Sequence, residues 1–198
     1  MDNKNNFLFL IFACACFLFL SFMLSPKLFA TIKENSFIFL SPAKNHFSLE
    51  NHLSVLKDPN GRLSIEDVSA QAMQANFSEV PTKNLNLGFS EATFWIRLPL
   101  NFDKNIHESK SLFFKIDRCQ LNICKLFIPE DCFDQNSAGH KWRVIDSAST
   151  KIQISKNTGI SCSPMIFDLP ACSHGPKIFY LQIHEPNGGL YLPLYLGT

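Results

Sequence analysis

The sequence predicts an all-β fold for this 198-residue chain, a two-sheet sandwich or a barrel that follows an N-terminal hydrophobic helix. Three observations lead to this prediction. About ten short apolar runs have the length and the β-branched or aromatic content of strands. Pro, Gly and Asn separate these runs, as expected for tight turns. Only one stretch carries helical spacing, which argues against alternating strand–helix units.

The N-terminal hydrophobic segment runs from Phe7 to Leu24 without a charged residue. Such a run is typical of an export signal or a membrane anchor, and its length fits either. Ala30 offers a small residue for cleavage, whereas Leu28 is larger than the usual cleavage pattern prefers. We therefore expect two parts: residues 1–30 as a signal peptide or N-terminal anchor, and residues 31–198 as an extracytoplasmic domain.

The first elements of that domain are a strand, a turn and a helix. Asp58-Pro59-Asn60-Gly61 has the chemistry of a tight turn. Ser64, with Asp67 three residues later, has the form of a capping box, so a helix is predicted from Ser64 to about Ala75.

The later elements are strands. Predicted strand positions, in order along the chain, are residues 37–40, 52–56, 94–100, 112–116, 123–128, 141–145, 151–157, 165–169, 178–184 and 190–196. Within residues 94–100 the apolar Phe94, Ile96 and Leu98 alternate with Trp95 and Arg97, so the two sets face opposite sides of a sheet.

Charge and composition exclude some function classes. The chain has 18 basic and 17 acidic residues, and its first thirty residues include Lys4, Lys27 and Asp2, so 16 of each sign remain. A balanced domain without a block of like charge has no electrostatic footprint for nucleic acid. After Ala30 no uninterrupted apolar run is long enough to span a bilayer.

Five cysteines follow the N-terminal segment: Cys119, Cys124, Cys132, Cys162 and Cys172. In an oxidising compartment disulfides persist, and an odd number leaves at least one thiol over or linked to another chain. Cys119 with Cys124 and Cys162 with Cys172 are plausible pairs, leaving Cys132. No zinc-type spacing is present, so no metal site and no cofactor are expected.

The order of the motifs resembles a known family. The matching positions are Asp58–Gly61, Ile65–Val68, Leu87-Gly88-Phe89, Trp95-Ile96-Arg97, Phe179–Ile183 and Leu190–Leu194. From about Ser36 to Leu196 the chain resembles the extracellular sensor domain, type 2, of bacterial seven-transmembrane receptors with diverse intracellular signalling modules. The resemblance implies a jelly-roll β-sandwich similar to carbohydrate-binding modules, placed in the periplasm or on the extracytoplasmic face of the cytoplasmic membrane. Unlike those receptors, this sequence contains no seven-helix bundle or output domain.

Four residues are candidates for ligand contact. Trp95 and Arg97 share one strand face, where an indole would stack on a sugar ring and a guanidinium would hydrogen-bond hydroxyls or a carboxylate. The alternative is that Trp95 fills a core and Arg97 pairs with a loop carboxylate. Trp142, which we expect to be exposed, and Tyr191, with Tyr195 on the same strand, would add stacking surface. For the tyrosines the alternative is interstrand aromatic pairing.

Together these observations predict a non-catalytic sensor domain that binds a small extracytoplasmic ligand, a carbohydrate being one candidate. Signalling would then need either a membrane partner or a C-terminal part of a longer receptor of which this chain is a fragment, and nucleic acid is not an expected partner. The alternative is an envelope interaction or dimerisation module without a small-molecule ligand. Gly88-Phe89-Ser90-Glu91-Ala92 lacks the final glycine of a hydrolase nucleophile elbow, so no enzymatic activity is expected.

Overall fold

The computed structural model describes residues 36–82, 84–106, 110–118, 121–134, 141–146, 154–155, 159–160 and 164–198. The predicted N-terminal helix, and with it the division at residue 30, lies outside these residues and stays a prediction. Within the described ranges no helix has both the length and the apolar character needed to cross a membrane.

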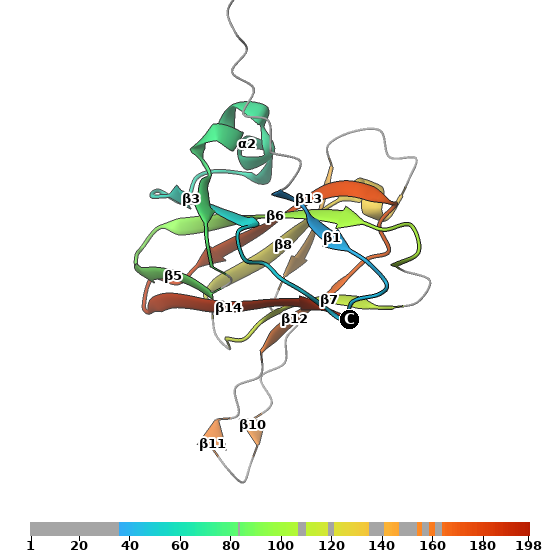
Figure 1. Cartoon of the computed structure of the whole chain (residues 1–198). Coiled ribbons are helices and arrows are strands. Elements are labelled where there is room, and N and C mark those ends of the chain that lie inside the picture. The colour runs from blue at the N-terminus through green and yellow to red at the C-terminus, as the bar shows by residue number, and fades with distance from the viewer. Residues whose placement is uncertain are drawn as a thin grey trace, which may run out of the picture. The chain divides into compact units, whose positions relative to one another are not determined.

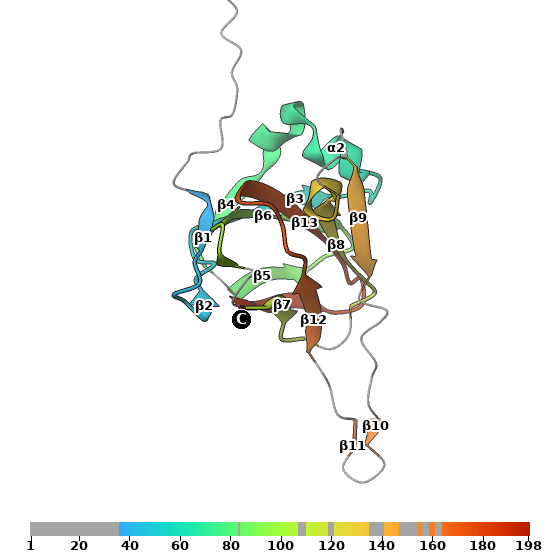
Figure 2. The same cartoon turned by 90° about the vertical axis from the view of Figure 1, so that its right-hand side faces the viewer.

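Two sheets lie face to face (Figures 1 and 2). The seven-stranded sheet has the order β4-β3-β6-β13-β8-β9, with β1 parallel to β6. Its strands are β1 (Ile38–Leu40), β3 (Leu53–Asp58), β4 (Ser78–Val80), β6 (Thr93–Phe102), β8 (Ile123–Pro129), β9 (Trp142–Asp146) and β13 (Gly175–His184). All its other strand pairs are antiparallel.

The second sheet has five strands in the order β12-β7-β14-β2, and β5 also pairs with β14. These strands are β2 (His46–Phe47), β5 (Asn84–Phe89), β7 (Leu112–Ile116), β12 (Met165–Leu169) and β14 (Gly189–Gly197). A separate short pair joins β10 (Ile154–Ser155) to β11 (Gly159–Ile160). The predicted all-β, jelly-roll-like two-sheet sandwich is thus confirmed as a sandwich of two mainly antiparallel sheets.

The main core lies between the sheets because side chains alternate along each strand. On β6, Phe94, Ile96 and Leu98 enter this core and Trp95 belongs to a second hydrophobic cluster on the other face, so the predicted division of the strand into two faces is confirmed. Aromatic rings from different strands meet in the main core. Phe114 of β7 and Phe167 of β12 have ring centroids 6.4 Å apart.

The predicted helix is correct at its start and wrong at its end. Helix α2 (Ile65–Ser69) begins after a complete capping box between Ser64 and Asp67. It stops at Ala70, whose ψ of 141° leaves the helical region, and the 3-10 helix η2 (Gln71–Asn76) follows. The side-chain amide of Gln74 donates hydrogen bonds to the carbonyl oxygens of Val68 (2.9 Å) and Ala70 (3.3 Å). These side-chain donors satisfy carbonyl groups at the break, so a continuous helix is not required there.

We expect the Ser64→Ala substitution to lower the free energy of unfolding by about 1 kcal/mol, because the side-chain oxygen that caps α2 is lost. Urea denaturation at neutral pH measures this difference. Ser69→Ala is the matched control on the same helix, since that hydroxyl only donates to the Glu66 carbonyl oxygen. Equal losses in the two variants would contradict the capping role.

The same cap has a pH dependence. Hydrogen bonds from the backbone and side chain of Ser64 lower the pKa of Asp67. A carboxyl whose pKa is lower in the folded state stabilises the fold above its unfolded pKa, about 3.9. That contribution is lost as pH falls through the lower folded pKa. The cap therefore acts fully at neutral pH and weakens only in strong acid.

Four strands were not predicted: β2, β4, β5 and β11. The Leu87-Gly88-Phe89 segment, which lies outside the predicted strands, forms the end of β5 and pairs with β14. The register shifts between Leu190 and Tyr191, opposite this segment, and Gly88 has a φ of 68°. Glycine adopts this left-handed conformation without a Cβ penalty, which allows the irregular pairing.

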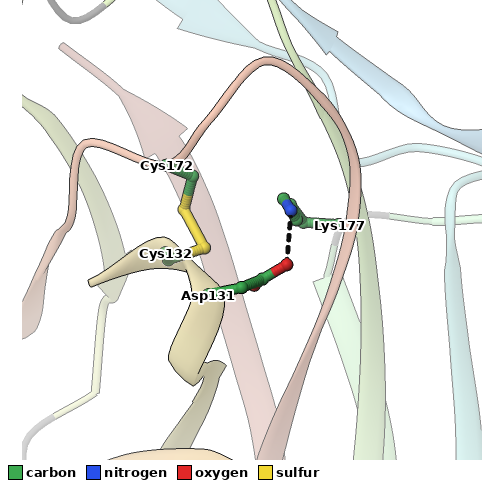
Figure 3. Close-up of polar contacts among 4 residues, drawn as sticks. All are labelled: Asp131, Cys132, Cys172 and Lys177. Atoms are coloured by element: carbon green, nitrogen blue, oxygen red, sulfur yellow. Dashed lines mark hydrogen bonds and ion pairs between the residues drawn. A yellow bond between two sulfur atoms is a disulfide. The ribbon is translucent and has the colours of Figure 1, made fainter. Parts of the chain in front are cut away.

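One disulfide joins Cys132 to Cys172 (Figure 3). The predicted pair of Cys162 and Cys172, with Cys132 left over, is therefore wrong. The correct partners are 40 residues apart in sequence, and the turn at η3 (Glu130–Cys132) brings them together. Beside the bridge, Lys177 Nζ lies 2.6 Å from Asp131 Oδ2. Cys119 lies outside the described residues, so its predicted pairing with the buried Cys124 stays a prediction.

Candidate functional site

The outer face of the seven-stranded sheet carries a second hydrophobic cluster, which we call the covered cluster. Its buried members are Leu56, Ile65, Val68, Phe77, Trp95, Phe127 and Tyr180, and Leu63, Met73, Trp142 and Ile178 pack against it. Helix α2 lies over this face of the sheet in both views (Figures 1 and 2). Residues of α2 and η2 therefore shield the strand face on which the sequence placed the ligand contacts.

Trp95 is at the centre of the covered cluster. Its side chain is 1% exposed, and its ring centroid lies 5.3 Å from that of Phe127 on β8. The indole therefore fills a core in this structure, as the alternative interpretation expected. Its Nε1 atom is buried and has no hydrogen-bond partner among the residues that the structure describes.

Arg97 lies beside this cluster and is held by neutral groups. Its Nε donates to Ser54 Oγ (2.8 Å), and its Nη1 donates to Gln74 Oε1 (2.9 Å). The guanidinium carbon is 4.9 Å from the centre of the Phe77 ring. No ion pair of Arg97 occurs within the described part of the chain, so the expected loop carboxylate is absent there.

Burial affects the ionisation of Arg97 and of its neighbour Tyr180. Desolvation lowers the pKa of Arg97, and interactions with Tyr180 and Glu79 partly offset this effect. Burial raises the pKa of the Tyr180 hydroxyl. That hydroxyl lies 3.4 Å from the same Gln74 oxygen that Arg97 contacts. Two donors from adjacent strands therefore meet on one amide oxygen.

Trp142 differs from its prediction as an exposed residue. It is half-buried because its ring packs edge-on against Tyr180, with centroids 5.4 Å apart. Its Nε1 is a second buried indole nitrogen without a partner in the described ranges. The surrounding charges of Lys141 and Arg143 suggested exposure, but the partner ring comes from a strand that is distant in sequence.

Tyr191 lies apart from the other three candidates. It is on β14, 51% exposed, on the outer face of the five-stranded sheet. The structure thus brings Trp95, Arg97 and Trp142 to one covered face and places Tyr191 on the opposite, open face. Sequence reasoning missed Gln74 and Tyr180. The alternation within residues 178–184 would have placed Tyr180 opposite the core-facing Phe179, whereas nothing local marked Gln74.

The open face of the five-stranded sheet contains a hollow of about 650 Å³. It is lined by His46, Phe47, Ser48, Leu49, Glu50, Phe113, Lys115, Ile166, Leu194, Tyr195, Leu196 and Gly197. These residues come from β2, β7, β12, β14 and the segment after β2. Only Tyr195 among them was considered from the sequence, because cross-strand neighbours cannot be seen without the pairing.

Aromatic and charged groups meet in this hollow. Tyr195 is 41% exposed, and Lys115 Nζ lies 4.4 Å from the centre of its ring. Lys115 also lies 3.8 Å from Asp117. At Gly197 a Cβ would lie 3.4 Å from the Phe113 ring and 3.0 Å from the carbonyl oxygen of Asn45. Glycine thus allows the backbone of β14 to approach its neighbours closely at this position.

Metal-ligating side chains are not grouped in the described ranges: no three His, Cys, Asp or Glu residues lie together there. Both faces carry aromatic rings, a few hydrogen-bonding groups and single charges.

These features define a two-sheet β-sandwich domain. Residues 50–198 match the family 7TMR-DISM extracellular 2, and the chain belongs to that family. The predicted family is confirmed, and with it a place among the extracellular sensor domains of membrane receptors. No curated protein matches the chain.

Proposed function

We propose that this domain is a non-catalytic sensor that binds a small extracytoplasmic molecule in the hollow of the five-stranded sheet, with a carbohydrate as the first candidate. The hollow itself carries the proposal. Its volume of about 650 Å³ falls within the usual range of ligand sites, which are mostly apolar with a few convergent polar groups. Membership in a family of receptor extracellular domains supports a sensing role.

The lining suits a ring that bears hydroxyl groups. The exposed ring of Tyr195 offers a stacking face, and Phe113 and Ile166 supply apolar walls. Lys115, His46 and Glu50 provide donors and an acceptor at the edges. Such a combination fixes the orientation of a polar ring while the apolar area supplies affinity. A membrane partner would pass the signal on. The predicted contacts of Trp95 and Arg97 with a ligand stay predictions.

The test is a thermal-shift screen of the purified chain against sugars, amino acids and organic acids. A ligand that binds only the folded state raises the unfolding midpoint with concentration. For a hit, we expect Tyr195→Ala to weaken binding at least about fivefold, because the loss of a stacked ring costs about 1 kcal/mol or more.

Tyr191→Ala is the matched control, since it removes an exposed tyrosine from the same strand and face but outside the hollow. Unchanged binding in this control places the ligand in the hollow. Equal loss in both variants would show a ligand that extends along β14, as the Tyr191 prediction holds. Full binding by Tyr195→Ala would contradict the proposed site.

A protein-interaction module is the second candidate. Ile166, Tyr191 and Tyr195 are large exposed apolar residues on one sheet face, and clustered residues of this kind are typical of contact surfaces. The predicted link between chains through Cys132 is excluded by its intramolecular bridge. Light scattering over a concentration series distinguishes the two functions. A dimer that Tyr191→Ala and Tyr195→Ala both dissociate, with no hit in the screen, would favour this second candidate.

A further inference from the structure

We propose that the covered cluster contains a second binding site, specific for a carboxylate group, and that the side chain of Gln74 occupies this site when no ligand is bound. This site is separate from the hollow and does not depend on it. The proposal rests on the charge of Arg97, on two unpartnered indole groups and on the position of the Gln74 amide.

Arg97 makes no salt bridge in the described part of the chain, and Glu79 interacts with its charge only electrostatically. Its guanidinium is partly desolvated, which lowers its pKa, and its direct partners are the neutral oxygens of Ser54 and Gln74. Buried charges in proteins are normally paired, because an unpaired one loses hydration without compensation. A guanidinium also binds carboxylates more strongly than neutral acceptors. Arg97 is therefore poised for an anionic group.

The two indole nitrogens point to the same conclusion. Trp95, at 1% exposure, and Trp142 both have a buried Nε1 without a hydrogen-bond partner among the described residues. Buried N–H groups are nearly always paired, so two such donors in one cluster require an explanation. A bound acceptor would satisfy them. Both rings lie near Arg97 in the fold: Trp95 is two residues before it on β6, and Trp142 packs on Tyr180, which pairs with Arg97 across β13 and β6.

In the structure, the side-chain amide of Gln74 occupies the position that we propose for the bound acceptor. Its Oε1 lies 2.9 Å from Arg97 Nη1 and 3.4 Å from the Tyr180 hydroxyl. Its Nε2 donates to the Val68 and Ala70 carbonyl oxygens and so connects the site to the break between α2 and η2. A carboxamide has the shape of a carboxylate but no charge. A ligand carboxylate would take its place on Arg97 and Tyr180 and release the amide toward this break.

Release of Gln74 would loosen the cover. Helix α2 has five residues and η2 has six, and both are too short to be stable without contacts to the sheet. Gln74 is one of those contacts, alongside the apolar packing of Ile65, Val68 and Phe77. Carboxylate binding would therefore change the order of the α2–η2 segment, which gives the second site a physical output.

The first test uses sodium acetate as the carboxylate probe and acetamide as its neutral analogue, at constant ionic strength. The chain has two tryptophans, so the ¹⁵N-labelled protein gives two indole N–H signals, assigned with Trp142→Phe. We expect acetate to shift both signals saturably and acetamide to leave them unchanged. Absence of a saturable acetate shift would overturn the proposal.

The second test replaces the Gln74 amide by a carboxylate. Gln74→Glu places a carboxylate on Arg97 but loses the amide donors to the Val68 and Ala70 carbonyl oxygens, so it is compared with Gln74→Met, which loses the same donors. At pH 7 its unfolding midpoint should lie about 3 °C above that of Gln74→Met. The gain should vanish as pH falls through the lowered pKa of the introduced carboxyl, and acetate should no longer shift the indole signals. Gln71→Glu, an exposed site on η2 with the same charge change, is the control.

Arg97→Gln completes the cycle. In that background Gln74→Glu should give no gain in midpoint, and acetate should be without effect. A Gln74→Glu variant no more stable than Gln74→Met, or a gain that persists without Arg97, would refute the site. Because these measurements follow the tryptophans and the midpoint, they are independent of any ligand in the hollow.

Discussion

Replacing Phe114 by alanine is expected to lower the free energy of unfolding by about 3–5 kcal/mol, the usual cost of removing a buried aromatic ring. Phe114 is 2% exposed and lies on β7, where it enters the core between the two sheets. Its ring contacts that of Phe167 on β12. The loss combines the transfer of the ring to water in the unfolded state with the cavity left behind, since packed sheets relax only partly.

The matched control is the preceding residue. The Phe113→Ala substitution also removes a phenylalanine ring, but from the opposite face of β7, where the Phe113 side chain is half-buried and lines the hollow. Phe113→Ala is expected to cost about 1 kcal/mol or less in stability. Urea denaturation at neutral pH measures both variants. If Phe113→Ala proved as destabilising as Phe114→Ala, the assignment of inner and outer faces on β7 would be wrong.

Removing the disulfide is the second change with a large expected effect. A bridge across 40 residues restricts the unfolded chain, which corresponds to about 4 kcal/mol in the loop-entropy description. The double variant Cys132→Ala, Cys172→Ala should be destabilised by this order of magnitude. Urea denaturation with and without dithiothreitol gives the measurement, and the reduced wild type should approach the double variant.

Dithiothreitol is also applied to the double variant, where any remaining effect reports on other disulfides, such as the predicted Cys119–Cys124 pair. Peptide mapping under non-reducing conditions identifies the partner directly. A peptide pair that joins Cys162 to Cys172 would support the pairing expected from the sequence and contradict the one in the structure. A wild type whose stability is indifferent to reductant would show that the bridge adds nothing to the folded state.

Much of the fold could be predicted because the alternation of side chains within a long strand reflects which face of the sheet each side chain occupies. The alternation from Phe94 to Leu98 told which side chains enter the core, and Ser64 with Asp67 marked the start of α2. The short strands β2, β4 and β5 have no such local pattern. Each exists through pairing with a longer strand, and Gly88 in β5 suggested a turn when it in fact accommodates an irregular register.

The candidate site was predicted only in part, since it depends on contacts between distant segments. The sequence placed Trp95 and Arg97 on one strand face, which the structure confirms, but it could not show that α2 and η2 cover that face. Gln74 accepts hydrogen bonds from Arg97 and Tyr180 in this cluster, yet no local sequence pattern distinguishes it from other glutamines in helices. The hollow was equally hidden, because Lys115 and Tyr195 become neighbours only through the register of β7 and β14.

The Cys132–Cys172 bridge also constrains how the sandwich can deform. Cys132 follows the last residue of β8 in one sheet, and Cys172 follows the last residue of β12 in the other. The two sheets are therefore joined by a covalent bond close to the C-terminal ends of β8 and β12. A stimulus that changes the distance between the two sheets is therefore opposed by the covalent bond between Cys132 and Cys172. A displacement of one sheet relative to the other would be smallest next to this disulfide and larger at a distance from it.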